Sequence, residues 1–288
     1  MRTWFITGAS RGFGALIAEA ALAKGDAVVA TARNPQGVID RLGAHDNLLT
    51  VALDVTDEAQ GHAAAKAAVE RFGRIDVLVN NAGYGLLGAV EEATGAEIEA
   101  LYRTNVFGLL AVTRAVLPHM RRQRSGRILN LSSVGGIRSG PGFGVYCSTK
   151  FAVEGLTEAL ATELSPLGVF ATAVEPGYFR TDFLDATSVV YAANPIADYA
   201  QASAALREFY EARSHNQAGD PAKLGQALVA LANAENPPVR WAAGTDAVGM
   251  IQGKIAGLTT ELEAWRGLSQ STDGDFSFRE ESGASAWG

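Results

Sequence analysis

Seven short apolar runs, separated by longer stretches with helical patterning, dominate the first 243 residues of the chain. Each run holds five to seven residues and carries at most one charge. Strands that are apolar on both faces and are joined by helices form parallel sheets that helices cover on both sides. The sequence therefore predicts an α/β fold with a doubly wound, seven-stranded parallel sheet. The predicted strands lie at 3–7, 27–32, 48–54, 75–80, 127–132, 169–175 and 239–243, and the predicted helices at 13–24, 58–72, 96–120, 146–164 and 220–233.

A single domain accounts for residues 1–268 in this interpretation, because neither a linker nor an internal repeat interrupts the pattern. The last predicted helix has a clear start, since Asp220 can cap it and Pro221 suits its first turn. The arginines of "RRQR" at 121–124 suit the C-terminal end of the helix before them. Residues 269–288 are polar and predict a mobile C-terminal tail.

The composition argues against several classes of function. A net charge of −7 and a pI of about 5.2 make nucleic acid or an anionic membrane an unfavourable partner. The single cysteine, Cys147, excludes an internal disulfide and a cysteine-rich metal site, and the four scattered histidines predict no metal site either. No apolar run approaches the about 18 residues of a spanning helix, and a strand pattern begins at once, which leaves no room for a signal peptide. We therefore expect a cytoplasmic protein.

A glycine-rich turn follows the first predicted strand, in "TGASRGFGALIAEAAL". Thr7 and Gly8 end the strand, and Gly12 and Gly14 open the next helix. Glycines at such a turn let the backbone approach a phosphate, and the helix N-terminus offers free N–H groups and the positive end of its dipole. Tight turns need glycine in any case, so it is the position between a strand and a helix that makes this a candidate phosphate site.

The end of the second predicted strand and the residues after it read "VVATARNP", and this stretch contains no carboxylate. An acidic residue at this place would hold a ribose 2′-hydroxyl and repel a 2′-phosphate. Arg33 stands there instead, and Arg11 in the glycine-rich turn can add a second cation. Two guanidinium groups suit a phosphate, which favours NADP over NAD. Two solvent-facing arginines are the simpler alternative.

Tyr146 precedes Lys150 by four residues on a stretch that otherwise predicts a buried helix. Residues four apart share one helix face, so the two side chains can meet. An ammonium near a phenol favours the phenolate and lowers its pKa from about 10. A surface tyrosine packed on a lysine stem is the alternative for this pair considered alone.

Five motifs in this order resemble the short-chain dehydrogenase/reductase family, in its short single-domain branch. They are "TGASRGFG" at 7–14, "NNAG" at 80–83, "SS" at 132–133, "YCSTK" at 146–150 and "EPGYFRT" at 175–181. The resemblance covers residues 3–182 densely and the remainder loosely. It implies a Rossmann fold that binds NADP(H) and transfers a hydride between a carbonyl and an alcohol.

The resemblance also implies a catalytic set. Tyr146 is the general acid or base at the carbonyl oxygen, and Lys150 lowers its pKa and binds the nicotinamide ribose. Ser133 holds the substrate oxygen; Ser132 is the competing candidate, and "VGG" directly after Ser133 is similar to hydroxysteroid and retinol dehydrogenase-like members. Asn105, in "RTNVFG", resembles the asparagine that holds a water in a proton relay to the lysine. A purely structural hydrogen bond is the alternative for Asn105.

Further cofactor contacts follow from the same resemblance. Asp54 accepts a hydrogen bond from the adenine amine, or else it caps the next helix. Pro176, Gly177 and Thr181 hold the carboxamide and orient the nicotinamide. The whole implied cofactor-binding set is Gly8, Ser10, Arg11, Gly12, Phe13, Gly14, Arg33, Asp54, Val55, Asn80, Ala82, Gly83, Tyr146, Lys150, Pro176, Gly177, Phe179 and Thr181.

A segment at 178–219 is similar to the family's substrate-covering lid. It is rich in apolar and aromatic residues and its arginines are dispersed, which favours a lipophilic ketone, aldehyde or secondary alcohol over a phosphorylated or carrier-bound substrate. Packing of these residues onto the core is the competing interpretation. The expected substrate pocket comprises Ser133, Gly135, Phe143, Tyr146 and Phe183.

Two other functions compete with this interpretation. A non-catalytic NADP(H)-binding regulator is disfavoured, because Ser133, Tyr146, Lys150 and Asn105 are all present. A sugar-nucleotide epimerase or dehydratase is disfavoured by the glycine spacing and by the absence of a larger C-terminal substrate domain. The resemblance also implies a homodimer or homotetramer formed through the helices predicted at 96–120 and 146–164.

Overall fold

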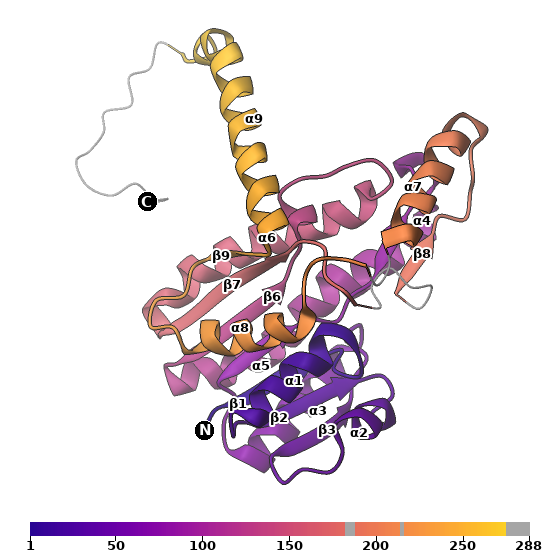
Figure 1. The fold of residues 1–288 in the computed structure, drawn as a ribbon. Coiled ribbons are helices and arrows are strands. Elements are labelled where there is room, and N and C mark those ends of the chain that lie inside the picture. The colour runs from indigo at the N-terminus through magenta and orange to yellow at the C-terminus, as the bar shows by residue number, and fades with distance from the viewer. Residues whose placement is uncertain (182–187, 214–215, 275–288) are drawn as a thin grey trace. The chain divides into compact units, whose positions relative to one another are not determined.

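The computed structural model describes residues 1–181, 188–213 and 216–274. The chain forms two compact units, residues 1–251 and residues 252–288. The first unit contains the sheets and most of the helices (Figure 1). The boundaries predicted for the domain and its tail, at residues 268 and 269, stay predictions.

Seven parallel strands form the main sheet in the order β3-β2-β1-β4-β6-β7-β9. All seven lie where the apolar runs predict them, which confirms the predicted fold class. The pairing of β1 with β2 and β4 aligns Phe5 with Val29 and Leu78. The strands are β1 (Thr3–Thr7), β2 (Ala27–Ala32), β3 (Leu48–Ala52), β4 (Val77–Asn80), β6 (Gly126–Leu131), β7 (Val169–Pro176) and β9 (Arg240–Ala243).

The strand order reverses between β1 and β4, since β2 and β3 lie on one side and β6, β7 and β9 on the other. A crevice opens beyond the carboxyl ends of the strands at such a reversal, because the loops that follow the two strands turn in opposite directions. The architecture therefore places a ligand site above the ends of β1 and β4.

Helices cover both faces of the sheet in the first unit (Figure 1). Helices α1, α2 and α8 contribute buried residues to the core on one face, and α3, α5 and α6 contribute to the core on the other. The helices are α1 (Gly12–Ala23), α2 (Gln36–Leu42), α3 (Glu58–Phe72), α4 (Gly95–Tyr102), α5 (Leu109–Gln123), α6 (Gly144–Leu164), α7 (Ala200–Arg213), α8 (Pro221–Asn233) and α9 (Thr245–Gln270).

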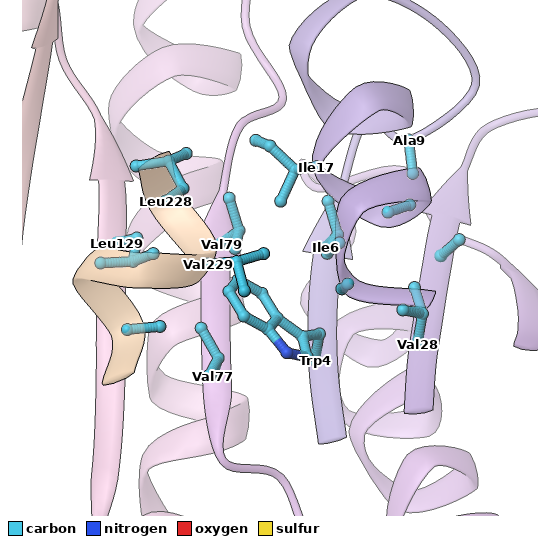
Figure 2. Packing of buried hydrophobic residues seen from close by; sticks show 14 of the residues in the cluster. Trp4, Ile6, Ala9, Ile17, Val28, Val77, Val79, Leu129, Leu228 and Val229 are labelled. Carbon is cyan, nitrogen blue, oxygen red and sulfur yellow. The ribbon is translucent and has the colours of Figure 1, made fainter. Parts of the chain in front are cut away.

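Trp4 of β1 is central to the first of these cores (Figure 2). Its indole is fully buried among aliphatic side chains that include Val79 of β4 and Val229 of α8. The one polar atom of the indole is satisfied, because Nε1 donates to Asp26 at 3.0 Å. A buried ring of this size stabilises the packing of α8 against β1 and β4, provided that its N–H has such a partner.

The helix predicted at 96–120 consists of three segments. Between α4 and α5 the backbone follows a π-helix over Arg103–Gly108, and α5 ends at Gln123. The start of α8 is as predicted, since Asp220 accepts from the N–H groups of Ala222 and Lys223 and Pro221 occupies the first turn.

Two regions differ from the sequence prediction. Strands β5 (Gly85–Leu87) and β8 (Val189–Tyr191) form a small parallel sheet outside the main one. Helices α2, α7 and α9 have no counterpart in the prediction, and α9 continues to Gln270. In the described ranges we find no helix that is long and apolar enough to cross a membrane.

Candidate active site

A cleft of about 1840 Å³ lies at the carboxyl ends of the strands in the first unit. Its wall begins at the glycine-rich turn after β1 and at the end of β2. It continues past the loop after β4, one face of α6 and the loop after β7, and it ends under α7. The cleft is therefore long enough to take an extended ligand at one end and a second ligand at the other.

The glycine-rich turn approaches its neighbours too closely for any larger residue. Gly8 and Gly12 have φ angles of +67° and +54°. A Cβ atom on Gly14 would lie 2.4 Å from the Gly8 carbonyl oxygen. In the described structure the Arg11 side chain does not cap α1, so the first N–H groups of this twelve-residue helix are not capped by a side chain. Such a helix start fits a phosphate group, as the sequence predicts.

Asn81 holds this turn against the end of β4. Its Nδ2 donates to the carbonyl oxygens of Thr7 and Gly8 at 2.9 and 3.1 Å. The Thr7 hydroxyl in turn accepts from the N–H groups of Asn81 and Ala82. Asn81, Ala82 and Gly83 line the cleft. Sequence reasoning named Asn80 instead of Asn81.

The structure gives Asn80 a different place. Asn80 is buried, and its amide donates to Thr113 and Asn130 at 2.9 Å each. Successive residues of a strand point to opposite sides, so a prediction that is one residue off names a side chain in the interior instead of one on the cleft wall. Asn80 thus ties β4 to α5 and β6, whereas Asn81 lines the cleft.

Arg33 and Asp54 stand at the far end of the cleft, next to the glycine-rich turn. Asp54 does not cap α3, because that role belongs to Asp57, which accepts from the N–H groups of Ala59 and Gln60. Asp54 accepts instead from the N–H and hydroxyl of Thr56 at 2.9 and 2.7 Å. Among the described residues, Asp54 is the one carboxylate on the cleft wall. Ser10, Arg11, Gly12, Phe13 and Val55 line the same end.

Tyr146 and Ser133 meet on the floor of the cleft. Tyr146 lies on the first turn of α6 and is only 7% exposed. Burial raises the pKa of the Tyr146 phenol well above its usual range, and a hydrogen bond with the Ser133 hydroxyl opposes that rise. Ser133 itself is held in place, because its Oγ accepts from the Gly135 N–H at 3.0 Å. The two hydroxyl groups therefore face one point in the cleft.

Lys150 lies one turn further along α6 and is 8% exposed. Its Nζ donates to the Leu131 carbonyl at 2.6 Å and lies 5.7 Å from the centre of the Tyr146 ring. Burial lowers the pKa of Lys150 to about 8. The net shift of the Tyr146 pKa is nevertheless upward, because desolvation of the phenol outweighs the lowering expected from Lys150, whose ammonium donates to a carbonyl.

Asn105 lies behind the cleft wall, in the π-helical segment between α4 and α5. Its Oδ1 accepts from the Tyr84 N–H at 3.1 Å, and its Nδ2 donates to the Tyr84 carbonyl at 3.0 Å and to Thr149 at 3.2 Å. Asn105 thus fastens the loop after β4 to α6, which carries Tyr146 and Lys150. A single widened turn is a common device for aiming one helical side chain at a functional site.

A buried acidic pair, which the sequence analysis missed, underlies Lys150. Glu154 follows Lys150 by one helical turn, and Glu175 is the penultimate residue of β7; their exposures are 4% and 2%. The Oε1 atoms of both carboxyl groups find no donor among the described residues. The two groups face each other, so a proton held between them satisfies both.

Charge near this pair sets which acid holds the proton. Burial and the adjacent Glu154 carboxylate raise the pKa of Glu175 to about 7. Burial also raises the pKa of Glu154, while Ser132 and Arg240 oppose the rise. Arg240 donates to Glu154 at 3.2 Å. Ser132 therefore faces this pair, whereas Ser133 faces Tyr146, and the geometry favours Ser133 over Ser132 as the substrate-facing serine.

The loop after β7 forms a further part of the cleft wall. Asp246, at the start of α9, accepts from the Tyr178 N–H at 2.7 Å, and the Phe179 ring packs edge-on against Phe13 at 5.5 Å. Sequence reasoning missed Asp246, because 68 residues separate it from its partner. Pro176, Gly177, Phe179 and Thr181 all line the cleft, where the sequence predicts a nicotinamide.

Aromatic side chains form the other end of the cleft. Phe143 packs edge-on against Tyr146 at 5.7 Å and against Tyr210 of α7 at 4.8 Å. Gly135 lines the same region, and a Cβ atom there would lie 3.1 Å from the Cys147 sulfur. Phe183 lies outside the described residues. Val190, Ala202, Ala205, Leu206 and Phe209 complete this apolar wall.

Other residues of the predicted lid hold it to the core or hold its own parts together. The Tyr199 hydroxyl donates to Glu91, outside the lid, at 2.9 Å. Within the lid, the Arg207 guanidinium lies 3.8 Å from the centre of the Tyr191 ring. Glu92 is buried and accepts from the Ala89 and Ile196 N–H groups. These backbone hydrogen bonds lower the pKa of Glu92. Both interpretations of the lid residues therefore apply, each to a different subset.

Known proteins are similar to this chain in sequence and in fold. A family model described as short chain dehydrogenase matches residues 2–189. Oxidoreductase BOA17 of Botryotinia fuckeliana is 39% identical over 271 residues, covering 93% of this chain and 98% of that protein. The 3-ketodihydrosphingosine reductase of Bacteroides thetaiotaomicron is 38% identical, covering 83% and 86%. The crystal structure of a short-chain dehydrogenase from Streptomyces avermitilis matches with a TM-score of 0.87 and 40% identity, covering 95% and 100%.

Two similar structures contain a nicotinamide cofactor. The 3-ketoacyl-(acyl-carrier-protein) reductase of Brucella melitensis, complexed with NADH, matches with a TM-score of 0.71 and 29% identity. ElxO, with NADP bound, matches with a TM-score of 0.69 and 27% identity. Each comparison covers 84% of this chain and 96% of the other. A nicotinamide cofactor thus fits this cleft, and the comparisons include both forms of it.

Proposed function

Since the chain belongs to the short-chain dehydrogenase family, whose members are oxidoreductases, we propose that it uses NADP(H) to interconvert a lipophilic ketone or aldehyde and its alcohol. The observation that carries this proposal is the meeting of Tyr146 and Ser133 on the floor of the cleft, one helical turn from Lys150. The cofactor supplies or accepts the hydride when it is bound.

Tyr146 and Ser133 hold the carbonyl oxygen of the substrate. Because burial keeps the Tyr146 phenol protonated at neutral pH, it can donate its proton to the oxygen as the alcohol forms. Ser133 donates a second hydrogen bond and keeps the oxygen beside the phenol. Gly135 and Phe143 shape the walls around this point.

Lys150 provides positive charge next to the proton donor. As the proton leaves, the ammonium stabilises the developing phenolate across the short distance from Lys150 to the Tyr146 ring. Asn105 acts as a positioning residue, since its three hydrogen bonds hold the loop after β4 against α6. We also propose that Asn105 holds a water in a proton relay to Lys150, as the resemblance implies.

The preference for NADP rests on charge at the adenosine end. Arg33 follows β2 and lines the cleft together with Arg11, and Ser10 and Asn34 add polar side chains there. Guanidinium groups bind a 2′-phosphate by charge-assisted hydrogen bonds, whereas NAD presents only a hydroxyl at this position.

The substrate class rests on the apolar wall under α7. The aromatic residues Phe143, Phe209 and Tyr210 lie at the end of the cleft away from the cofactor-binding turn. The Bacteroides relative, which is named as a reductase of a keto compound, is consistent with a ketone substrate. We also propose that the protein is related to the hydroxysteroid and retinol dehydrogenase-like members of the family.

The test is NADPH consumption with a panel of apolar ketones and aldehydes, for the wild type, Tyr146→Phe and Tyr102→Phe. Loss of the proton donor should lower kcat by roughly 10²- to 10⁴-fold. Tyr102 is a matched control, because its hydroxyl bonds to Ser148 away from the cleft wall. Binding of NADPH without turnover of any carbonyl would instead support the non-catalytic regulator.

The assembly and the cellular location remain predictions from the sequence. Phe107 and Phe151 are 57% and 44% exposed. They lie within the ranges 96–120 and 146–164, through which the resemblance implies a homodimer or homotetramer. A cytoplasmic location is the corresponding expectation for the whole chain.

A further inference from the structure

The second half of α9 carries a row of exposed apolar side chains. Ile255, Leu258, Leu262 and Trp265 are 58%, 50%, 59% and 63% exposed. They are spaced by three, four and three residues, which places them in one stripe along the helix. This alternation is the spacing of the seam residues of a coiled coil. We call these four residues the α9 seam.

The composition of α9 indicates that this helix needs a partner. Gly253, Gly257 and Gly267 lie within it, and glycine is the poorest helix former after proline. Most of the stability of a helix in a protein comes from packing of its apolar face, and here that face is exposed. An exposed patch of this size marks an interaction site more often than a bare surface.

We propose that the α9 seam packs against α9 of a second copy of this chain, with the two helices antiparallel. In this pairing, Ile255 packs against Leu258 of the partner subunit, and Leu258 packs against the partner's Ile255. Further along the helix, Leu262 and Trp265 lie opposite the partner's Ile251 and the partner's Val248, which are also residues of α9. The interface is separate from the helices at 96–120 and 146–164 through which the family resemblance implies an oligomer.

Charges beside the α9 seam favour the antiparallel direction. Lys254 and Glu261 flank the same side of the seam, and within the part of the chain that the structure describes neither makes an ion pair or a side-chain hydrogen bond. Antiparallel pairing brings Lys254 next to the partner's Glu261, and it does so twice by symmetry. Parallel pairing would need the partner's Arg266, but in each copy Arg266 is already paired with Glu263.

The apolar area is sufficient for a specific interface. Leu268, which is 63% exposed, extends the seam at its edge. At about 100 Å² of apolar surface for each of these five side chains, pairing removes roughly 1,000 Å² from water over both copies. This is about the minimum that specific protein interfaces bury.

Charge also argues against a membrane as the occupant of the α9 seam. Helices that lie on membranes carry an excess of lysine and arginine on the polar face. Between residues 252 and 270, Lys254 and Arg266 are balanced by Glu261 and Glu263, and residues 271–288 contain four acidic residues and one arginine. The segment therefore has no excess positive charge that anionic lipid would attract.

The experiment is sedimentation equilibrium of the full-length protein. Leu258→Glu with Leu262→Glu should halve the mass of the assembly, because each variant seam would bury charge against its partner. Thr260→Glu with Ala264→Glu adds the same charge on the opposite side of α9 and should leave the mass unchanged. A mass that stays the same in the seam variant, with vesicles of phosphatidylcholine and phosphatidylserine binding the wild type but not the variant, would assign the seam to a membrane and overturn the proposal.

Charge exchange tests the direction of pairing. Lys254→Glu and Glu261→Lys should each weaken association about ten-fold, and the double variant should restore it, because the exchanged charges again oppose each other in an antiparallel pair. In a parallel pair, Glu261→Lys would face the partner's Arg266, so the double variant would remain weak. That result would overturn the antiparallel arrangement. Equal unfolding temperatures of all variants serve as the control for folding.

Discussion

The two ends of the cleft are built in different ways. The cofactor end is made by the sheet itself: Gly8 and Gly14 touch, and Asn81 bonds both to the strand end and to the turn. The substrate end combines Phe143 and Tyr146 with segments added after β7, in which β8 pairs with β5 and Ser203 of α7 bonds to Glu92. Main-chain contacts shape the cofactor end, whereas apolar side chains shape the wall of the substrate end.

Because of this difference, substitutions at the two ends of the cleft should affect different properties of the protein. A change at the cofactor end disturbs main-chain atoms that are hydrogen-bonded and cannot relax, so it should affect every reaction of the protein. A change under α7 alters only the shape of an apolar wall. Reaction type should thus depend on the sheet end, and substrate choice on the lid.

Among the changes that compare the two ends of the cleft, Gly14→Ala should have the largest effect. The added Cβ would lie 2.4 Å from the Gly8 carbonyl oxygen and 2.6 Å from Nδ2 of Asn81, so the turn must move. Overpacking of about 1–3 kcal/mol corresponds to a roughly 10- to 100-fold weaker affinity for NADPH. A fluorescence titration measures it. Gly95→Ala is the control, because no neighbouring atom lies within 4 Å of the new Cβ; equal affinities for both variants would remove the distinction between the two ends.

Arg33→Asp should have the next largest effect. The change removes a charge-assisted contact to the 2′-phosphate and adds a carboxylate that accepts a ribose hydroxyl. The ratio of NADPH to NADH affinity should fall by roughly 10- to 100-fold. Arg41→Asp is the control, since Arg41 pairs with Glu19 on α1. An unchanged ratio would show that Arg33 faces solvent in the complex.

Glu175→Gln should change how stability depends on pH. The pKa of Glu175 is raised in the folded chain, from 4.5 to about 7. The stability that its bound proton contributes is thus complete below pH 4.5 and is lost as the pH rises through about 7. Glutamine keeps a hydrogen-bond donor at every pH. Between pH 5 and 8, the free energy of unfolding of the variant should therefore fall by about 1–2 kcal/mol less than that of the wild type.

Thermal unfolding at a series of pH values measures this difference and needs no substrate. Glu158→Gln is the matched control, because Glu158 also bonds to Arg240 but is exposed. If Glu175→Gln and the wild type have the same pH dependence, the proton does not reside on this pair.

Leu206→Ala should have the smallest effect and sharpens the comparison from the lid side. Leu206 of α7 lines the apolar end of the cleft. Its truncation enlarges the pocket, and the ratio of kcat/KM between bulky and small ketones should change by on the order of ten-fold or less. NADPH affinity should not change. A loss of NADPH affinity would mean that the lid and the cofactor end form one unit.

Much of the fold could be predicted because its signals are local in the sequence. Each of the seven strands is a short apolar run, and the start of α8 is set by two adjacent residues, Asp220 and Pro221. Helix α9 had a local signal as well, in the spacing of three and four from Ile255 to Trp265. The sequence prediction did not use this spacing, and the helix is seen only in the structure.

Contacts between distant residues account for what could not be predicted. Glu154 and Glu175 are 21 positions apart and meet only because α6 packs on β7, so neither residue alone indicates a shared proton. The choice between Asn80 and Asn81 depends on which way a strand faces. The pKa of Tyr146 depends on how fully the core buries it, which outweighs a lysine four residues away.

The sequence by itself determined the parallel sheet, the glycine-rich turn and the pairing of Tyr146 with Lys150 on one helix face, because strand and helix periods act over a few residues. Only the tertiary structure decided that Lys150 points at Leu131, that Ser133 rather than Ser132 faces Tyr146, and that Asp246 holds the loop after β7. Those outcomes depend on hydrogen bonds and desolvation between elements that are far apart in the chain. Such interactions exist only after the sheet has brought the elements together.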